Sequence, residues 1–192
     1  MPVITDEKMP KVFITSDTHF NHENIIKYCN RPFASVVEMN QALIDNWNRV
    51  VRPQDTIIHC GDFAFTRANK KVAATTVSTF VHKLNGRKIL ILGNHDNQRI
   101  SYRDCGFGAQ FELFWVVGSK VFCHCMDWVE EADKCGRFIY YGHVHDNDIA
   151  PNGPNWKNVC VEQTNYTPVD ITANLTDDEY RIIVKTAGVN NR

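Results

Sequence analysis

Short apolar runs alternate with longer amphipathic stretches in the first half of this chain. Residues 11–15 (KVFIT), 55–60 (DTIIHC) and 88–92 (KILIL) are apolar over most of their length, which predicts three short strands buried on both faces. Between these runs, apolar residues recur every three or four positions, as they do along one face of a helix. This second pattern is carried by Met39, Leu43, Trp47 and Val50, and again by Ala73, Val77, Phe80 and Leu84.

Local signals mark where these helices begin and end. Ser35 is followed three residues later by Glu38, the spacing of a capping box, so the first helix is expected over about residues 36–51. Gly86 suits the left-handed residue that ends the second helix. Strands and helices that alternate in this order are typical of parallel strands joined by crossover helices.

The second half of the chain has a different pattern. Its strand-like segments follow one another with shorter connections, which predicts a second, more mixed sheet. These segments are residues 111–117, 121–124, 137–141 and 159–162. A last helix is expected from Thr176, which forms a capping box with Glu179. Two sheets packed face to face and covered by helices would use all of these elements.

Nothing in the sequence marks a boundary between domains. The 192 residues are 43% hydrophobic, enough for one full core, and they contain no internal repeat, low-complexity tract or linker-like stretch. We therefore interpret residues 1–192 as a single domain of the α/β class, with residues 1–10 and 188–192 as loose ends.

Charge and cysteine content narrow the classes of partner. Lysine and arginine number 21 against 22 aspartate and glutamate, so no long nucleic acid is expected as a partner, whereas a small phosphorylated substrate or a short oligonucleotide is compatible. No apolar run approaches the roughly 20 residues that span a bilayer, so no membrane partner is expected. The seven cysteines form no CxxC pair and follow no leader, which favours reduced thiols and a cytoplasmic protein.

Polar side chains of a few kinds follow five of the predicted strands. In open α/β sheets, ligands bind beyond the carboxyl ends of the strands, so these side chains are expected to meet. In extended backbone, residues i and i+2 project to the same side, so Asp17 with His19, and His143 with His145, are expected to point as pairs. The full set comprises Asp17 and His19, Asp62, Asn94 with His95 and Asp96, His124, and His143 with His145.

This set of side chains suits two divalent metal ions. Two carboxylates, three or four imidazoles and one amide oxygen supply enough ligands and leave positions open for water. Oxygen and nitrogen ligands without thiolates favour manganese, with iron, nickel or zinc as alternatives. Glycines at positions 61, 93 and 142 would let the backbone approach a ligand closely. Each fragment alone also has a purely structural interpretation, such as an Asx turn for GNHD, so the prediction rests on the joint pattern.

The joint pattern resembles the calcineurin-like metallophosphoesterases. The similarity is carried by DTH at 17–19, GD at 61–62, GNHD at 93–96, His124 and GHVH at 142–145. The segments SDTHFNHENIIKYCNRPF and LNGRKILILGNHD resemble a small, single-domain bacterial and bacteriophage branch of that family. The resemblance implies a four-layer αββα sandwich of two mixed β-sheets flanked by helices, with a dimetal site at one edge.

The resemblance also implies roles for individual residues. Asp17, His19 and His145 would bind the first metal, Asn94, His124 and His143 the second, and Asp62 would bridge the two. His95 would lie beside the scissile phosphate, with Asp96 holding its ring. The expected chemistry is hydrolysis of a phosphoester, favouring a small phosphodiester or nucleotide, by a hydroxide shared between two ions about 3.5 to 4 Å apart.

Two alternatives to this function remain open at this stage. One is a scaffold that keeps the fold without catalysis, and the other is a nuclease on short single strands. The second block continues as GDFAFTR, unlike the GDxVDRG of protein serine/threonine phosphatases, which disfavours a phosphoprotein substrate. Cys123 and Cys125 flank His124, and either thiol turned inward would shift the metal preference toward zinc.

Three further residues are candidates for contacting the substrate. Arg31 and Arg99 are the nearest guanidinium groups, which bind phosphate bidentately, although a surface position is the alternative for Arg99. His22 begins a predicted helix and either reaches the substrate or serves as a capping histidine. By contrast, His59 is expected in the core and His82 on a solvated helix face.

Overall fold

The computed structural model describes residues 9–66, 69–147 and 152–188 and contains two β-sheets. Most of the expected loose ends, residues 1–8 and 189–192, lie outside the described residues. In the first sheet, β1 to β4 run parallel in the order β4-β3-β2-β1, and β9 lies antiparallel to β1 at the edge. The strands are β1 (Val12–Thr15), β2 (Thr56–His59), β3 (Arg87–Ile91), β4 (Ala109–Phe111) and β9 (Val169–Asp170). The three strands expected in the first half are confirmed as neighbours.

The second sheet is mixed, as the sequence predicts. Its order is β5-β6-β7-β8, in which β5 and β6 are antiparallel and the remaining pairs are parallel. The strands are β5 (Phe114–Val117), β6 (Lys120–Cys123), β7 (Phe138–Tyr141) and β8 (Trp156–Asn158).

Two of the expected strands differ from those in the structure. The segment 111–117 divides into β4 and β5, which belong to different sheets, so the chain crosses between sheets within the predicted strand. The strand expected over 159–162 is also wrong. There the chain forms a short 3-10 helix, η3 (Val161–Thr164), closed by Asn165 and Tyr166 in left-handed conformation.

The helices begin at the residues that the capping signals indicate. They are α1 (Glu23–Tyr28), α2 (Val36–Val50), α3 (Lys70–Val81), α4 (Glu131–Lys134) and α5 (Asp177–Ala187), with short 3-10 helices η2 (Met126–Trp128) and η4 (Thr172–Asn174). Thr176 and Glu179 form the complete predicted capping box. At α2 the hydroxyl of Ser35 accepts a hydrogen bond from the backbone N–H of Glu38, but the Glu38 carboxylate binds the Ala34 N–H instead. Gly86 is left-handed but lies in the turn before β3, because α3 already ends at Val81.

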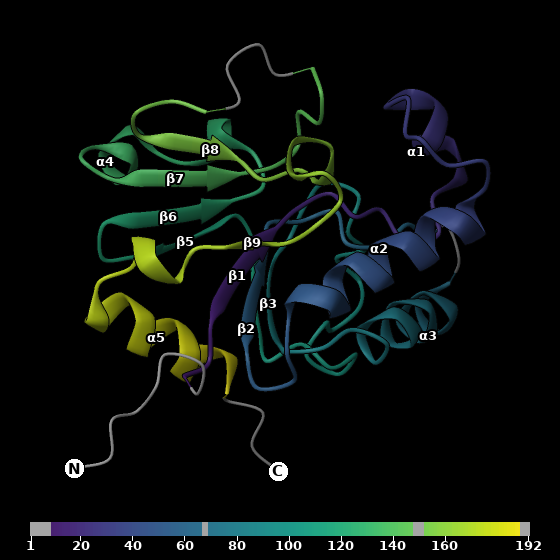
Figure 1. Cartoon of the computed structure of the whole chain (residues 1–192), viewed down its shortest axis with the longest axis horizontal. Coiled ribbons are helices and arrows are strands. Elements are labelled where there is room, and N and C mark those ends of the chain that lie inside the picture. The colour runs from purple at the N-terminus through teal and green to yellow at the C-terminus, as the bar shows by residue number, and fades with distance from the viewer. Residues whose placement is uncertain (1–8, 67–68, 148–151, 189–192) are drawn as a thin grey trace.

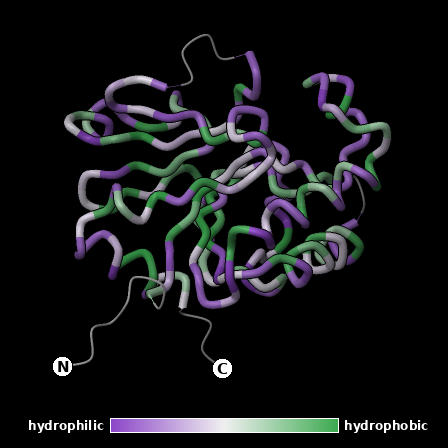
Figure 2. The backbone as a smooth tube through the Cα atoms, viewed as in Figure 1, coloured by the Kyte–Doolittle hydropathy of each residue, from purple (hydrophilic) through white to green (hydrophobic). Residues whose placement is uncertain are grey.

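The layers follow from which face each strand residue uses. In β1, Phe13 packs with α1, α2 and α3, while its neighbours Val12 and Ile14 pack against the second sheet and α5. The outer face of the second sheet is covered by the segment around η2, with α4 beside it (Figure 1). Hydrophobic residues accordingly concentrate along the strands in the middle of the molecule (Figure 2). The expected four-layer αββα sandwich of two mixed sheets is confirmed.

This arrangement places the candidate site at one edge of both sheets. The parallel strands β1, β2 and β3 end together, and β6 and β7 of the second sheet end beside them. The carboxyl edge therefore collects the polar residues that follow each strand. Within the described residues, no helix has the length and apolar character needed to cross a membrane.

Candidate metal centre

The candidate ligands lie on strained turns immediately after the strands. Asp17, His19, Asp62, His143 and His145 all have positive φ, between 49° and 77°. They are five of the nine non-glycine residues with this conformation in the described chain. Such backbone costs a non-glycine residue on the order of 1 kcal/mol. Its concentration in one set of polar residues points to a functional role for the turns.

These turns correct the interpretation of the paired motifs as extended backbone, because both members of each pair are left-handed. Asp17 and His19 still converge, with Oδ1 of the aspartate 3.9 Å from Nε2 of the histidine. His143 and His145 diverge instead. Nδ1 of His143 lies 3.0 Å from Asn94 Oδ1, whereas Nε2 of His145 lies 3.6 Å from Asp17 Oδ1. The GHVH motif therefore contributes to both halves of the site.

The glycines at 61, 93 and 142 are all required by close approach, as expected, and a Cβ atom on Gly61 would collide with the Gly93 backbone and the His124 ring. A Cβ atom on Gly93 would collide with the backbone and carboxylate of Asp62, and one on Gly142 would collide with the side chains of Ser16 and Asp17. Any larger residue at one of these positions would push a candidate ligand out of place.

Only one of the two carboxylate oxygens of Asp17 has hydrogen-bond partners among the described residues. Its Oδ2 accepts hydrogen bonds from the Ser16 hydroxyl at 2.5 Å, the His143 backbone N–H at 3.0 Å and the Cys160 thiol at 3.2 Å. Its Oδ1 is fully buried and has no hydrogen-bond partner among the described residues. Because a buried carboxylate oxygen without a hydrogen bond is unfavourable, this atom is a candidate ligand for a cation.

The histidines are oriented through the ring nitrogen that faces away from the centre. Nδ1 of His124 lies 2.9 Å from the Cys60 carbonyl, so it carries the proton and leaves Nε2 as an electron-pair donor. Nδ1 of His145 lies 3.0 Å from Glu162 Oε1, and Nδ1 of His19 lies 3.2 Å from Nδ1 of His22. In each case Nε2 is left facing the candidate ligands, which is the arrangement of a metal-binding imidazole.

Asp62 lies between the two halves of the site. Its Oδ2 is 3.3 Å from Nε2 of His19 and 3.6 Å from Nε2 of His124, while its Oδ1 accepts the backbone N–H of His95 at 2.8 Å. On the far side, Nε2 of His124 and Nδ1 of His143 both approach Asn94 Oδ1, at 2.9 and 3.0 Å. We call Asp17, His19 and His145 the first half-site, and Asn94, His124 and His143 the second half-site.

Burial and charge shift the pKa values of these groups in opposite directions. Burial would raise the pKa of Asp17, but the nearby imidazoles of His124 and His145 hold it below its usual range. Burial lowers the pKa of both His19 and His143. Burial opposes the charge on His145 as well, yet hydrogen bonds with Cys29 and Glu162 and the charge of Asp17 outweigh it and raise its pKa to about 11.

The residues present fit a dinuclear metal centre. Asp17 Oδ1 and His19 Nε2 are both buried without a hydrogen-bond partner of adequate geometry among the described residues. Asp17, His19 and Asp62 bring their donor atoms within 4.8 Å of one another. Carboxylate oxygens, imidazole nitrogens and one amide oxygen are the ligands that divalent transition metals take.

His95 and His22 line the rim of the centre. The exposed ring of His95 lies 5.5 Å from that of His19, measured between centroids. His22 is the N-cap residue of α1 and is buried, and its ring stacks on Phe65 at 3.9 Å. His22 therefore occupies the N-cap position without a side-chain capping bond and contacts the candidate ligand His19, and its reach to the substrate stays a prediction.

Asp96 does not hold the ring of His95. Its two oxygens accept backbone N–H groups of Asp62, Phe63 and Gly93 at 2.9 to 3.0 Å. Burial, together with the negative charge of Asp62, raises its pKa to about 7. The expectation from the resemblance is wrong because Asp96 turns inward, where it ties the loop after β2 to the loop after β3.

Neither arginine guanidinium contacts the side chain of a candidate ligand among the described residues. The guanidinium of Arg31 is fully buried and binds Glu162 together with the backbone carbonyls of Asp17 and Thr18, so its assignment as a phosphate clamp is wrong. Arg99 is exposed, and only its backbone N–H has a hydrogen bond, to Asn97, among the described contacts. Arg31 holds the backbone of Asp17 and Thr18 in place, and Arg99 is a surface residue.

The sequence analysis missed Glu162 and Cys160. Cys160 donates its thiol hydrogen bond to Asp17, and Glu162 binds both Arg31 and His145. Glu162 ends a strand that the sequence predicts over residues 159–162, so the rule applied to the other strand ends also points to it. By contrast, Cys123 bonds the Tyr140 carbonyl and does not turn into the site.

The two remaining histidines have the structural roles expected of them. Nε2 of His59 lies 3.0 Å from the Thr18 hydroxyl in the core, and burial lowers its pKa to about 3. His82 is exposed at the end of α3 and contacts Ser78.

A cavity opens beside the second half-site. It has a volume of about 270 Å³ and is lined by Cys125, Met126, Asp127, Tyr141, Gly142, His143 and Val144. Trp128 lies next to it, with its ring 5.6 Å from that of His124 and 6.3 Å from that of His143. The walls are largely apolar, and Asp127 supplies one carboxylate.

Comparison with known proteins places this chain in one family of phosphoesterases. The family model of the calcineurin-like phosphoesterases matches residues 10–183. An uncharacterized protein of Methanocaldococcus jannaschii is 40% identical over 169 residues, which cover 85% of this chain and 88% of that protein. The Gene 66 protein of Mycobacterium phage L5 is 33% identical over 116 residues, covering 59% of this chain and 52% of that protein.

Among solved structures, a protein of unknown function from Aquifex aeolicus has a similar fold. It superimposes with a TM-score of 0.65 at 23% identity and covers 84% of this chain and 96% of its own. At this level of identity the likeness concerns the fold alone.

Proposed function

Because the chain belongs to the calcineurin-like phosphoesterase family, we propose that it is a metal-dependent phosphoesterase acting on a small phosphodiester. The observation that carries the proposal is the buried, unpaired Oδ1 of Asp17, surrounded by inward-facing imidazole nitrogens. A scaffold that only retained the fold would have no reason to keep this unfavourable atom without a cation to bind it.

Seven residues would hold two divalent ions. Asp17, His19 and His145 would bind one ion, Asn94, His124 and His143 the other, and Asp62 would contact both. When bound, such a pair of ions lowers the pKa of water toward neutrality and neutralises charge on phosphoryl oxygens.

His95 would act on the substrate itself. Its backbone N–H is fixed by Asp62 at 2.8 Å, so its position follows that of the centre, and its ring is exposed at the rim. An imidazole placed there can donate a hydrogen bond to a phosphoryl oxygen or a proton to the leaving oxygen. His22 would support this face of the site through its contact with His19.

Two observations favour a diester over a monoester. First, a monoester dianion needs more positive charge than a diester monoanion. Arg31 is committed to Glu162 and to backbone carbonyls, so it supplies no clamp, and Arg99 is exposed with no described side-chain contact to the centre. Second, the cavity of about 270 Å³ beside His143 gives a second ester group a largely apolar place to bind.

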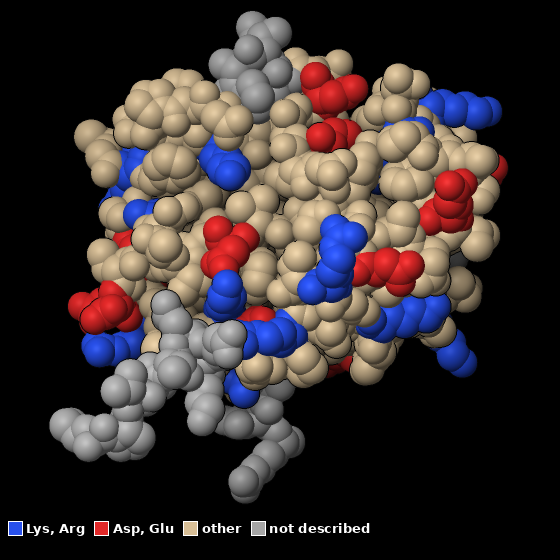
Figure 3. Space-filling view, viewed as in Figure 1, with Lys and Arg blue, Asp and Glu red and all other residues tan. Residues whose placement is uncertain are grey.

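The surface charge supports a small substrate. Figure 3 shows lysine and arginine intermixed with aspartate and glutamate, without a continuous basic stripe on that face. Together with the net charge of -1 this gives little attraction for a long nucleic-acid backbone.

The proposal is tested by reconstitution from metal-free protein. Manganese, nickel, zinc or magnesium is added back, and hydrolysis of bis-p-nitrophenyl phosphate is compared with that of p-nitrophenyl phosphate and of single-stranded DNA. We expect metal-dependent cleavage of the diester that is lost in Asn94→Ala. Faster monoester cleavage would overturn the diester assignment, and DNA cleavage would favour the nuclease. Two bound ions without hydrolysis of any substrate would favour the scaffold.

A further inference from the structure

The stretch from the end of β8 through η3 surrounds His145 with hydrogen bonds. The side-chain amides of Asn158 and Gln163 both donate to the His145 backbone carbonyl, at 3.2 and 3.0 Å. Glu162 Oε1 lies 3.0 Å from Nδ1 of the same histidine. Backbone and ring of His145 are therefore both held by residues from one short stretch of chain.

Glu162 is itself held in place by Arg31. The guanidinium donates from Nε at 2.9 Å and from Nη2 at 2.7 Å, both to Oε1, the oxygen that also contacts His145. The same guanidinium donates to the carbonyls of Asp17 at 2.7 Å and Thr18 at 3.0 Å. Both side chains of the pair are buried, at 0% and 5% exposure. One rigid cluster thus joins the turn that carries Asp17 to the turn that carries His145.

The backbone around Glu162 is kept in an unfavourable conformation. Asn165 and Tyr166 follow η3 with φ of 50° and 55°. Such residues persist only where surrounding contacts determine them. Here the Tyr166 N–H bonds the Val161 carbonyl, and the Tyr166 ring packs on Phe33 at 5.0 Å. These contacts hold the turn that follows η3 in place.

We propose that Glu162 is the positioning residue of the first half-site, with Arg31 as the group that fixes it. The carboxylate would hold the His145 ring with Nδ1 as donor and Nε2 directed at the ion shared with Asp17. This inference rests on the proposed metal-dependent function. It differs from simple packing in that Glu162 would act through His145 on the affinity for metal.

The first half-site is distinguished from the second by this carboxylate. His124 is oriented by the neutral Cys60 carbonyl, and His19 by the imidazole of His22. A carboxylate behind a metal-binding histidine fixes the ring and strengthens its electron-pair donation, and its loss typically weakens metal binding about 10- to 100-fold. We therefore expect variants of Glu162 to weaken the first half-site selectively.

The test isolates that half-site by working in Asn94→Ala protein, which lacks the amide ligand of the second one. Binding of Co²⁺ is measured by equilibrium dialysis and by the visible absorption of the bound ion. Glu162→Gln alone would leave Arg31 buried without a counter-charge and is expected to lower stability. The double variant Arg31→Met/Glu162→Leu removes both charges, so it tests the pair without leaving either charge buried alone.

We expect the double variant to bind Co²⁺ about 10- to 100-fold more weakly than its Asn94→Ala parent and to show a changed absorption spectrum. Glu162→Gln should lose less affinity, because its amide oxygen still accepts the His145 N–H. Glu179→Gln is the matched control, since Glu179 is an equally buried carboxylate far from the centre. It should bind Co²⁺ as the parent does.

Two results would overturn the inference. One is parental Co²⁺ affinity in the double variant, and the other is equal weakening by Glu179→Gln, which would indicate a general effect of stability. Failure of the proposed function is distinguishable from either. Protein that binds two ions but hydrolyses no ester, and whose affinity still depends on Glu162, would remove the function and keep the inference.

Discussion

Buried carboxylates occur at both ends of β1 and β2 in the described structure, and at the carboxyl end one of them, Asp17, keeps an oxygen without a hydrogen bond. At the opposite end, Asp55 is fully buried and accepts hydrogen bonds from the Lys11 and Arg52 N–H groups and from the Arg52 guanidinium, each at 2.8 Å. At the carboxyl end, Asp17 is equally buried and keeps one oxygen without a hydrogen bond. Two equally buried aspartates thus differ in whether both of their carboxylate oxygens have hydrogen bonds.

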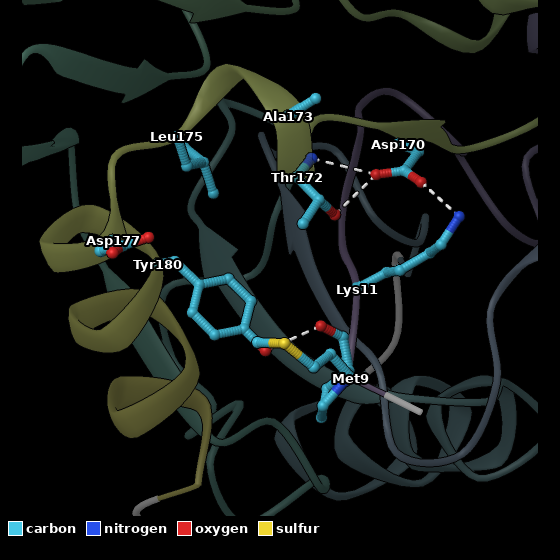
Figure 4. Close-up of a pocket in the computed structure, with 9 residues that line it drawn as sticks. Met9, Lys11, Asp170, Thr172, Ala173, Leu175, Asp177 and Tyr180 are labelled. Atoms are coloured by element: carbon cyan, nitrogen blue, oxygen red, sulfur yellow. Dashed lines mark hydrogen bonds and ion pairs between the residues drawn. The ribbon is translucent and has the colours of Figure 1, made fainter. Parts of the chain in front are cut away.

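In the surface groove at the amino end of β1, polar groups have hydrogen-bond partners as Asp55 does. The groove has a volume of about 670 Å³ and lies between the start of β1, η4 and the start of α5 (Figure 4). Asp170 binds Lys11 at 2.8 Å and the Thr172 hydroxyl at 2.6 Å, and the Tyr180 hydroxyl donates to the Pro10 carbonyl. These polar groups satisfy one another.

The difference teaches where this chain uses its charges for stability and where it holds them for chemistry. A carboxylate whose hydrogen bonds are complete stabilises the fold, and its removal leaves buried donors unpaired. A carboxylate held on a left-handed turn with one oxygen free of hydrogen bonds keeps that oxygen available to a bound ligand. Four substitutions test this distinction, taken from the largest expected effect to the smallest.

Asp62→Asn is expected to have the largest effect, mainly on activity. Replacing the carboxylate that faces both half-sites should lower metal-dependent diester turnover by about 10⁴-fold or more, through lost binding of both ions. In metal-free protein the amide oxygen can still accept the His95 N–H. Burial would raise the pKa of Asp62, but the imidazoles of His19 and His124 hold it below its usual range, so loss of the charge should lower the urea midpoint only slightly. A large fall in that midpoint would contradict the comparison.

His95→Ala should lower turnover by about 10²- to 10⁴-fold while both ions remain bound, because the ring lies at the rim and is not one of the seven candidate ligands. Stopped assays with the diester dye give the rate, and metal analysis of the same sample gives the stoichiometry. Near-normal turnover would exclude His95 from the reaction. Loss of an ion would make it a ligand.

Asp55→Ala should change stability and leave the metal centre intact. It removes a fully buried carboxylate from two backbone donors and the Arg52 guanidinium, at a cost of about 3 kcal/mol in the free energy of unfolding. Urea denaturation measures this loss, and Co²⁺ dialysis on the same protein should show parental affinity. Weakened Co²⁺ binding would mean that the two ends of the sheet are coupled.

Lys88→Met is expected to have the smallest effect, and the difference in stability between the variant and the wild-type protein should depend on pH. Burial lowers the pKa of Lys88 to about 8, below the ordinary value of 10.5 in the unfolded chain. The wild-type protein should therefore gain stability as pH rises from about 8 to 10.5, where only the unfolded state keeps the proton. The variant should lack this rise and be more stable at pH 7 by about 1 to 2 kcal/mol. Parallel urea curves at pH 7 and pH 10 decide it.

Local patterns in the sequence determined most of the fold and the composition of the candidate centre. Apolar periodicity predicted β1, β2, β3, α2 and α3, and capping residues placed the starts of α2 and α5. The rule that ligands gather at the carboxyl ends of strands collected all seven candidate ligands. Such signals depend on residues a few positions apart, which is why they can be read along the chain.

The tertiary structure alone decided which partner each supporting side chain meets. Arg31 looked like a phosphate clamp, but its partner is Glu162, 131 positions away. Asp96 adjoins His95 in sequence, yet it turns to backbone groups of the loop after β2. A buried charge goes to the nearest group that can satisfy it, and that group is brought close by the packing of distant segments. The sequence thus determined which side chains form the centre, and the fold determined what holds them there.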